Sequence, residues 1–450
     1  MVVYLLVANG FPPTAYGGVE VYVSDLARAL SQEGCEVAVV CAERRSDVPD
    51  GGVIRDRFED IPVFRIVNDF KNRISFSMTY LDAGIEACFA QLLGEVQPSV
   101  VHFNHVITLS AGLPKVVDQL GIPSVYTLHD FWPLCQRVNL LDWRDRRCPG
   151  PRQGGDCHRC LARGTVLQQL RTVMISAMRS LVPHRLRVIL RDLLSRQGAA
   201  VPDLYPSPEV LEDRYEAFRS AVLTAQRVLA PSQFVKNTYV RNGYPEDKIE
   251  VLPLGLDRVR VPVQRGIMEK GQLRIGYVGS MLPIKGVDIL IKAFRRVREP
   301  SVSLDLYGRL DIIPSYSRQL RLLALLDRRV RFRGSFRPED KDRIYNQIDV
   351  LVVPSLAQET FSFVAREALI RGIPVLASSV GALSEVVEPG VNGWLVAPGN
   401  VSELANVLRD VVQRRGVTDG TALVAPDGVL SVHEHMARIA SIYDAALASG

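Results

Sequence analysis

The stretch Asp349–Gly372, DVLVVPSLAQETFSFVAREALIRG, determines how the second half of this 450-residue chain folds. Its apolar run VLVV predicts a short buried strand, which the following Pro-Ser pair ends. Apolar residues then recur at helical spacing until Gly372, so a helix follows the strand after a short loop. Two carboxylates, Glu359 and Glu367, flank the corner between loop and helix, with seven residues between them. Because free backbone N–H groups at such a corner favour an anion, the stretch predicts a ligand site.

The composition of the chain is that of a globular protein with two or three domains. Hydrophobic residues make up 47% and charged residues 23%, which argues against disorder. A net charge of +5 is small for this length and does not indicate a nucleic-acid partner. No apolar run reaches about 18 residues, so we expect no membrane-spanning helix. The first residues are typical of a strand rather than a leader peptide, which indicates a cytoplasmic location.

Strand-like and helix-like runs alternate in two series along the chain, which predicts parallel sheets with right-handed crossovers. The pattern lapses between Val259 and Gln272, which we interpret as a linker. The predicted fold class is therefore α/β, with two Rossmann-like, doubly wound parallel-sheet domains facing a cleft. We expect an N-terminal domain over 1–262 and a C-terminal domain over 270–428. We expect a final helix over 429–450. It can pack on either domain, including back on the N-terminal domain.

Three further motifs carry residues suited to binding an anion or moving a proton. Lys285, in GSMLPIKG, follows the first strand of the second series and is placed to pair with phosphate oxygens. Gly17 and Gly18 precede a helix and let the backbone approach a phosphate. His129 ends the strand PSVYTLHD, where it can donate a hydrogen bond or shuttle a proton. Taken singly, each has a simpler interpretation: a solvated lysine, an ordinary turn, and a histidine hydrogen-bonded at a strand end.

Taken in order, these motifs resemble one known family. GGVE at Gly17, HD at His129, APS at Ala230, GSMLPIKG, the E-x7-E pair and GALSEVV at Gly381 extend over nearly the whole chain. Together they resemble the retaining, nucleotide-sugar-dependent glycosyltransferases with the GT-B fold (family 4, "glycosyl transferases group 1"). The resemblance implies transfer of a hexose-type sugar from a nucleoside diphosphate sugar to a hydroxyl group, in polysaccharide or glycolipid assembly. It also implies a saccharide or lipid-linked saccharide acceptor, and no catalytic metal.

The resemblance implies a role for each matching residue. Glu359 contacts the hydroxyls of the transferred sugar, and Glu367 accepts hydrogen bonds from the ribose. Lys285 neutralises the diphosphate leaving group, where charge develops during transfer. His129 lies near the reacting face of the sugar. On this interpretation the N-terminal domain is the acceptor side, the C-terminal domain holds the nucleotide sugar, and His129, Glu359 and Lys285 form the catalytic set.

Further contacts with the nucleotide sugar are implied at Gly17, Gly18, Ser280, Arg309, Thr360, Phe361 and Ser362. One position departs from the family pattern, because many members carry arginine where this chain has Ser280. Arg309, in LYGRL, is the residue that we expect to supply the missing charge. Two alternatives stay open: a GT-B-shaped sugar-nucleotide binding protein without turnover, for which Ser280 is the hint, and a GT-B sugar-nucleotide epimerase.

A separate feature is the cysteine-rich segment 131–162. Cys135, Cys148, Cys157 and Cys160 fall within 26 residues, and the last two form a CxxC pair. Four thiolates from short loops suit tetrahedral zinc, which would order a segment too small to bury its own core. We expect a structural zinc here; the alternatives are an iron–sulfur cluster, a redox pair, or reduced cysteines without a ligand. The odd total of seven cysteines argues against a disulfide framework.

The next segment, 163–197, predicts two basic amphipathic helices. Seven arginines and one aspartate accompany apolar residues at helical spacing, with Pro183 between the two stripes. Such helices can lie on an anionic membrane near a lipid-linked acceptor, which would place the protein peripherally at the inner face of the membrane. They can equally pack on the N-terminal domain with their arginines solvated.

Overall fold

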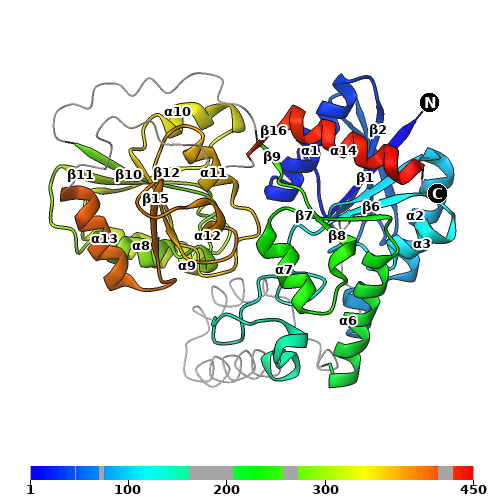
Figure 1. The fold of residues 1–450 in the computed structure, drawn as a ribbon, viewed down its shortest axis with the longest axis horizontal. Helices are drawn as coiled ribbons and strands as arrows, with labels where there is room; N and C mark the ends of the chain where they lie inside the picture. Colours follow the sequence, from blue (N-terminus) through cyan, green and yellow to red (C-terminus); the bar gives the residue numbers. More distant parts are fainter. Residues whose placement is uncertain are drawn as a thin grey trace, which may run out of the picture. The chain divides into compact units, whose positions relative to one another are not determined.

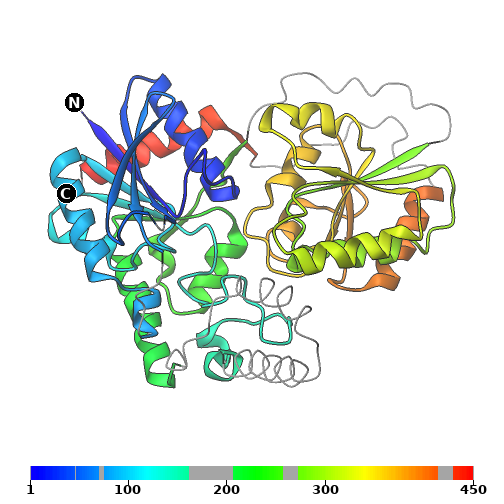
Figure 2. The same cartoon turned by 180° about the vertical axis from the view of Figure 1, so that it is seen from behind.

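The computed structural model describes residues 2–45, 47–69, 75–161, 206–256, 272–413 and 429–448. The chain divides into two compact units, each built on a β-sheet (Figures 1 and 2). Unit 1 contains Met1–Val228, Thr238–Lys248 and Ile442–Gly450. Unit 2 contains Leu229–Asn237 and Ile249–Ser441.

The first sheet has eight described strands. They are β1 Val3–Ala8, β2 Glu36–Glu43, β3 Val53–Phe58, β4 Ile61–Val67, β5 Val100–Phe103, β6 Ser124–Thr127, β7 Arg227–Ala230 and β8 Ile249–Val251. Their order in the sheet is β3-β4-β2-β1-β5-β6-β7-β8, so the direction of winding reverses between β1 and β5. The described α-helices of this part of the chain are α1 Gly18–Gln32, α2 Ala83–Val96, α3 Leu113–Gln119, α6 Pro208–Leu223 and α7 Gln233–Arg241.

The edge of the first sheet is an antiparallel hairpin that the sequence analysis did not predict. Phe58 of β3 pairs with Ile61 of β4 across a two-residue turn, in which Glu59 has a φ of 54°. The sequence of β3, VIRDRF, contains three consecutive charged residues and has no buried residue. It therefore lacks the continuous apolar run that is typical of a parallel strand covered on both faces. The first sheet is mixed rather than wholly parallel.

The second sheet has six described strands, and all of its pairs are parallel. They are β10 Leu273–Val278, β11 Val302–Tyr307, β12 Val330–Gly334, β13 Val350–Val353, β14 Val375–Ser378 and β15 Gly393–Val396. The order β12-β11-β10-β13-β14-β15 is doubly wound and reverses between β10 and β13. The helices of unit 2 include α8 Val287–Phe294, α9 Pro314–Leu325, α10 Lys341–Tyr345, α11 Phe363–Leu369, α12 Leu383–Val386 and α13 Val401–Gln413.

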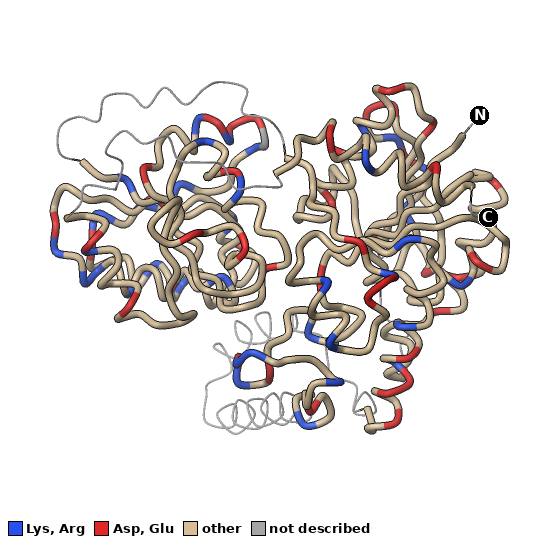
Figure 3. Tube along the Cα trace, in the orientation of Figure 1, with Lys and Arg blue, Asp and Glu red and all other residues tan. Residues whose placement is uncertain are grey.

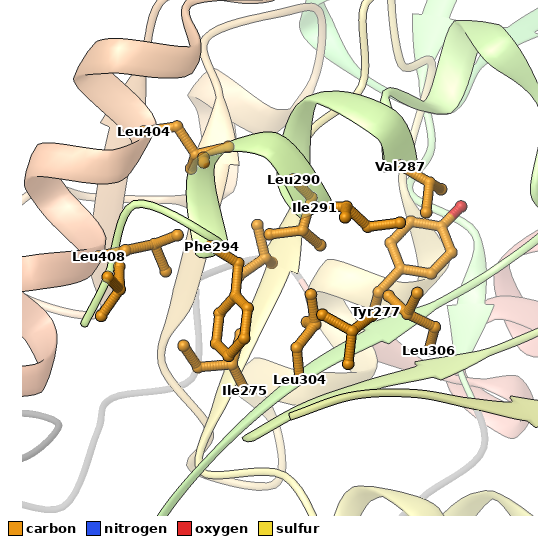
Figure 4. Close-up of a cluster of buried hydrophobic side chains, with 14 of the residues drawn as sticks. Ile275, Tyr277, Val287, Leu290, Ile291, Phe294, Leu304, Leu306, Leu404 and Leu408 are labelled. Carbon is orange, nitrogen blue, oxygen red and sulfur yellow. The ribbon is translucent and has the colours of Figure 1, made fainter. Parts of the chain in front are cut away.

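The apolar run of β13 is continuous because both of its faces are buried. Val350 and Val352 enter one buried cluster, whereas Leu351 and Val353 enter another. This is the two-residue period of a strand, and it places one cluster on each side of the sheet. In the first cluster, Phe294 of α8 lies among side chains from the strands and from α13 (Figure 4).

The end of the chain returns to unit 1. Strand β16, Leu430–Ser431, pairs with β9, Gly255–Leu256, and leads into α14, Val432–Leu447. Near the end of α14, the Tyr443 hydroxyl lies 2.7 Å from Nδ1 of His102, and its ring lies 4.7 Å from that of Tyr4. A buried tyrosine with a hydrogen-bond partner fixes this last part of the helix against the first sheet.

Acidic and basic residues are interspersed along the trace of each unit (Figure 3). Within the described residues, no helix combines the length and the apolar character that crossing a bilayer requires.

Replacing Leu304 with alanine should lower the free energy of unfolding by about 2–5 kcal/mol, because its side chain is fully buried in the first cluster of unit 2. Urea denaturation followed by circular dichroism measures the change. L322A is the control, since Leu322 on α9 is 61% exposed, and it should change stability by less than about 0.5 kcal/mol. Equal losses in the two variants would contradict this assignment of the core.

Candidate functional site

The candidate site lies in unit 2, where the loops that follow β10 and β13 meet. Asp349 ties the starts of these strands together, because it pairs with Arg274 at 2.8 Å. At their carboxyl ends, the amide of Leu356 donates to the carbonyl of Ile284 at 2.8 Å. Gly286 has a φ of +67°, and a Cβ atom there would overlap the carbonyl oxygen of Pro354. Glycine is therefore required for this approach of the two loops.

Lys285 and Glu359 form an ion pair at this junction. The Nζ of Lys285 lies 2.7 Å from Oε1 of Glu359, and the hydroxyl of Ser355 donates to the same oxygen at 2.5 Å. Burial alone would raise the pKa of Glu359, but the Lys285 ammonium and the two hydrogen bonds hold it below its usual value. Glu359 is thus ionised at neutral pH. The structure brings together two of the three residues predicted to be catalytic.

Glu367 on α11 is held by two residues that the sequence analysis did not identify. Its Oε1 lies 2.6 Å from Nζ of Lys341, and its Oε2 accepts a hydrogen bond from the hydroxyl of Tyr345 at 2.8 Å. The carboxylate is buried, and the Arg371 guanidinium donates to its backbone carbonyl at 2.8 Å. Lys341 and Tyr345 begin and end α10, which precedes β13 in the sequence. Their contact with Glu367 is tertiary, so no local pattern marked them.

The loop Thr360–Ser362 is fixed from one side by the start of α12. The amide of Ala382 donates to the carbonyl of Glu359 at 2.8 Å, and Gly381, with a φ of +56°, leaves no space for a side chain there. Ser362 also has a positive φ, 59°, as the N-cap of α11. Its buried hydroxyl has no hydrogen-bond partner among the described residues. An unpaired buried hydroxyl in this loop is compatible with a ligand contact.

Arg366 is a buried cation beside this loop. Its Cζ lies 3.8 Å from the centre of the Phe361 ring, and burial lowers the pKa of its guanidinium to about 10. Within the described part of the chain, its Nη1 has no hydrogen-bond partner. The sequence signal for it was weak, because an arginine within a helix is usually solvated.

The backbones of the Ser280 loop and of Arg309 lie close together. The carbonyl of Ser280 accepts from the Tyr277 hydroxyl at 2.8 Å, and the Met281 amide donates to the Arg309 carbonyl at 3.2 Å. The guanidinium of Arg309 pairs with Asp311 at 2.9 Å and is largely exposed. Its role as the substitute cation stays a prediction.

Gly17 and Gly18 start α1 in unit 1. Gly17 is the N-cap, and the carboxylate of Glu20 folds back so closely that it would overlap a Cβ atom there. The side chain of Asn9 donates to this carboxylate at 2.9 Å. The N-terminus of α1 thus faces an acidic side chain of the protein itself. The phosphate contact predicted for the two glycines stays a prediction.

His129 is buried at the end of the strand that precedes it, with Nε2 3.1 Å from Oδ1 of Asn104. A second histidine, His105, lies 2.6 Å from Asp130 through Nε2. Because Nδ1 of His105 accepts from the amide of Ile107 at 2.9 Å, Nε2 must carry the proton that it shares with Asp130. These residues line a cavity of about 10 Å³, which is the size of one water molecule.

Asn104 and His105 were not among the residues predicted for the site. They lie at the end of β5, beside the end of β6, where parallel strands bring their carboxyl ends to one edge. The run VHFNH carried this signal, but it was read only as a strand.

The four cysteines of the 131–162 segment have free thiols. Cys148 follows a short antiparallel bridge between Leu141 and Arg147, while Cys157 and Cys160 share one helical turn. Among the described residues, no group of three or more histidine, cysteine or acidic side chains is arranged to hold a metal ion. The predicted zinc is not confirmed and stays a prediction. The predicted helices at 163–197 lie outside the described residues.

Comparison with known families gives two matches. Residues 16–189 match the model of Glycosyltransferase Family 4, and residues 272–414 match that of Glycosyl transferases group 1. The two matched ranges together include more than half of the chain.

Several curated proteins are similar in sequence. D-inositol 3-phosphate glycosyltransferase of Nocardia farcinica is 32% identical over 39% of this chain and 43% of its own length. The MMP alpha-(1->4)-mannosyltransferase of Mycolicibacterium hassiacum is 33% identical over 36% of this chain and 39% of its own length. These matches therefore span about two fifths of each relative. D-inositol 3-phosphate glycosyltransferase of Xylanimonas cellulosilytica is 27% identical over 87% of this chain and 82% of its length.

Solved structures share the fold along the whole chain. Sucrose-phosphate synthase of Thermosynechococcus elongatus has a TM-score of 0.66 at 19% identity, covering 100% of both chains. Anabaena Alr3699/HepE in complex with UDP-glucose has a TM-score of 0.61 at 19% identity, covering 99% of this chain and 100% of that chain.

The doubly wound sheets and these neighbours show the GT-B fold, and the family matches assign both halves of the chain to glycosyltransferase families. The chain carries a family 4 glycosyltransferase domain in its first half and a glycosyl transferases group 1 domain in its second. The predicted fold class and the predicted enzyme class are both confirmed.

Proposed function

We propose that this enzyme transfers a hexose-type sugar from a nucleoside diphosphate sugar to a hydroxyl group, with retention of the anomeric configuration. The observation that carries the proposal is the Lys285–Glu359 pair, at the point where the winding of the second sheet reverses. In the reaction, the bond between the anomeric carbon and the diphosphate breaks, and a bond to the acceptor oxygen forms. The departing diphosphate gains negative charge as its bond breaks.

Lys285 is suited to neutralise that charge. Its side chain is about one-third exposed and its ammonium is held by Glu359, so the lysine can still meet a ligand. A preorganised cation at the leaving group stabilises the transition state more than the ground state, since the charge is larger there. Because Ser280 cannot supply a second cation, Lys285 would neutralise a larger share of the charge on the departing diphosphate.

Glu359 and Glu367 would bind two further parts of the nucleotide sugar, the transferred sugar and the ribose. Glu359 is kept ionised and in place by Lys285 and Ser355, so it can accept hydrogen bonds from sugar hydroxyls. Glu367 is oriented by Lys341 and Tyr345, and its remaining lone pairs can accept from the ribose.

His129 is proposed to contact the transferred sugar from unit 1. The contact of its Nε2 with Oδ1 of Asn104, at 3.1 Å, sets the orientation of the ring. The acceptor is proposed to be a saccharide or a lipid-linked saccharide, in polysaccharide or glycolipid assembly. The nature of the relatives supports a sugar-transfer role, and the UDP-glucose bound by the Anabaena protein supports a nucleotide sugar as substrate.

Replacing Lys285 with alanine should lower turnover about 10²–10³-fold, because one group that stabilises the leaving charge is lost. The assay follows release of nucleoside diphosphate from UDP-, GDP- and ADP-sugars, with and without saccharide acceptors. K292A is a matched control, since Lys292 of α8 pairs with Asp288 at 2.7 Å in the same unit. It should retain near-normal turnover.

Equal turnover in the K285A and K292A variants would remove Lys285 from the mechanism. If the unmutated protein bound a nucleotide sugar without consuming it, the binding-protein alternative would replace the proposal. Interconversion of the sugar without release of nucleotide would instead indicate the epimerase.

We also propose that the four cysteines hold a structural zinc ion. The support is that all four thiols come from a single short segment, two of them from one helical turn and one from the end of a β-bridge. Four thiolates are one of the ligand sets that structural zinc takes in tetrahedral sites. The ion would hold the loops of the segment together and take no part in transfer.

Purified protein should contain about one equivalent of zinc by mass spectrometry, and C157S/C160S should contain less than about half. C88S is the control, because Cys88 on α2 lies outside the segment, and its metal content should match that of the unmutated protein. Iron in place of zinc would indicate the iron–sulfur alternative. Absence of both metals from the unmutated protein would contradict a metal site.

A further inference from the structure

Helix α9 is apolar on two opposite sides. Its inner side enters the first buried cluster of unit 2 through Tyr316, Leu320 and Ala324. Its outer side carries Leu322 and Leu325, which are 61% and 76% exposed, and Leu326 follows directly at 75%. Residues three and four apart share one face of a helix, so these leucines project together, away from the core. An apolar group of side chains that points away from the core is a candidate surface for a binding partner.

Exposed apolar side chains are concentrated at this place. Of the eight large hydrophobic residues that are exposed in the described part of the chain, four lie between 312 and 326: Ile312, Leu322, Leu325 and Leu326. The other four are scattered singly. A lone exposed leucine needs no explanation, whereas a contiguous group marks an interaction surface.

Arginines surround these leucines. Arg318 and Arg321 on α9, and Arg328 and Arg331 after it, are exposed. Within the described residues, none of the four has an ion pair or a side-chain hydrogen bond, and Asp327 is paired with Arg329 at 2.7 Å. The surface is therefore apolar at its centre and positive at its margin, and its nearby carboxylate, Asp327, is already paired.

We propose that this α9 surface, formed by Leu322, Leu325, Leu326, Arg318 and Arg328, docks on an anionic lipid bilayer. The leucines would enter the boundary between headgroups and acyl chains, and the arginines would contact lipid phosphates. A second copy of the chain fits the surface less well. In a two-fold contact the same residues meet themselves, so unpaired arginines would face arginines.

The inference does not depend on the proposed sugar-transfer reaction, since none of these residues belongs to the Lys285–Glu359 site. It concerns a part of unit 2 that the sequence analysis did not connect with membranes. Docking here would hold the enzyme where lipid-linked substrates are found, and it requires no spanning helix.

The test is co-sedimentation of the full chain with vesicles of phosphatidylcholine, alone or mixed with phosphatidylglycerol. We expect binding to the mixed vesicles only, weakened by salt. L325S/L326S should lower the partition coefficient at least about tenfold, because two apolar side chains no longer enter the lipid. R318Q/R328Q should also lower it and reduce its dependence on salt. L120S is the matched control, since Leu120 of unit 1 is 54% exposed and isolated, and it should bind normally.

Vesicle binding by L325S/L326S equal to that of L120S would overturn the proposal, as would absence of binding by the unmutated protein. A dimer of the unmutated protein that L325S/L326S converts to a monomer, measured by light scattering, would show that a second copy is the occupant. Circular dichroism checks that the variants are folded, which the exposure of these side chains leads us to expect. Turnover of a free nucleotide sugar by L325S/L326S should be normal, so failure of the docking proposal is distinguishable from failure of the proposed reaction.

Discussion

The ion pair between Lys285 and Glu359 joins the two loops on which the candidate site depends. Each loop leaves the sheet at the end of a parallel strand, and β10 and β13 are neighbours because the winding reverses between them. The pair places a cation and a carboxylate side by side at that point, and the Ser355 hydroxyl donates to the same carboxylate oxygen as Lys285. The Lys285–Glu359 contact thus provides both a cation for a phosphate and a hydrogen-bond acceptor for sugar hydroxyls.

Close approach of backbones is the constraint that allows this contact. A side chain at Gly286 would overlap the carbonyl of Pro354, and one at Gly381 would overlap the backbone of Glu359. Both glycines also have a positive φ, which other residues adopt only at a cost. The loops therefore meet without intervening side chains, and backbone hydrogen bonds such as that from the Leu356 amide to the Ile284 carbonyl join them.

Local pattern was sufficient to predict the fold class, because period and composition are properties of short segments. The run VLVV predicted β13 correctly, and its continuous apolar character follows from burial on both faces. The hairpin of β3 was missed because its run of three consecutive charged residues is typical of a loop. In the site, Lys285 and Glu359 were identified through motifs, and the structure brought them together. Lys341 and His105 were missed because their partners, Glu367 and Asp130, are distant from them in sequence.

The central claim is that Lys285 holds the diphosphate of a nucleotide sugar. Titration calorimetry of the unmutated protein and K285A, with a nucleoside diphosphate and with the matching nucleoside, tests it most directly. We predict that K285A weakens binding of the diphosphate about tenfold to a hundredfold, the effect of losing a charged hydrogen bond, and leaves binding of the nucleoside unchanged. Equal weakening of both ligands, or of neither, would contradict the claim.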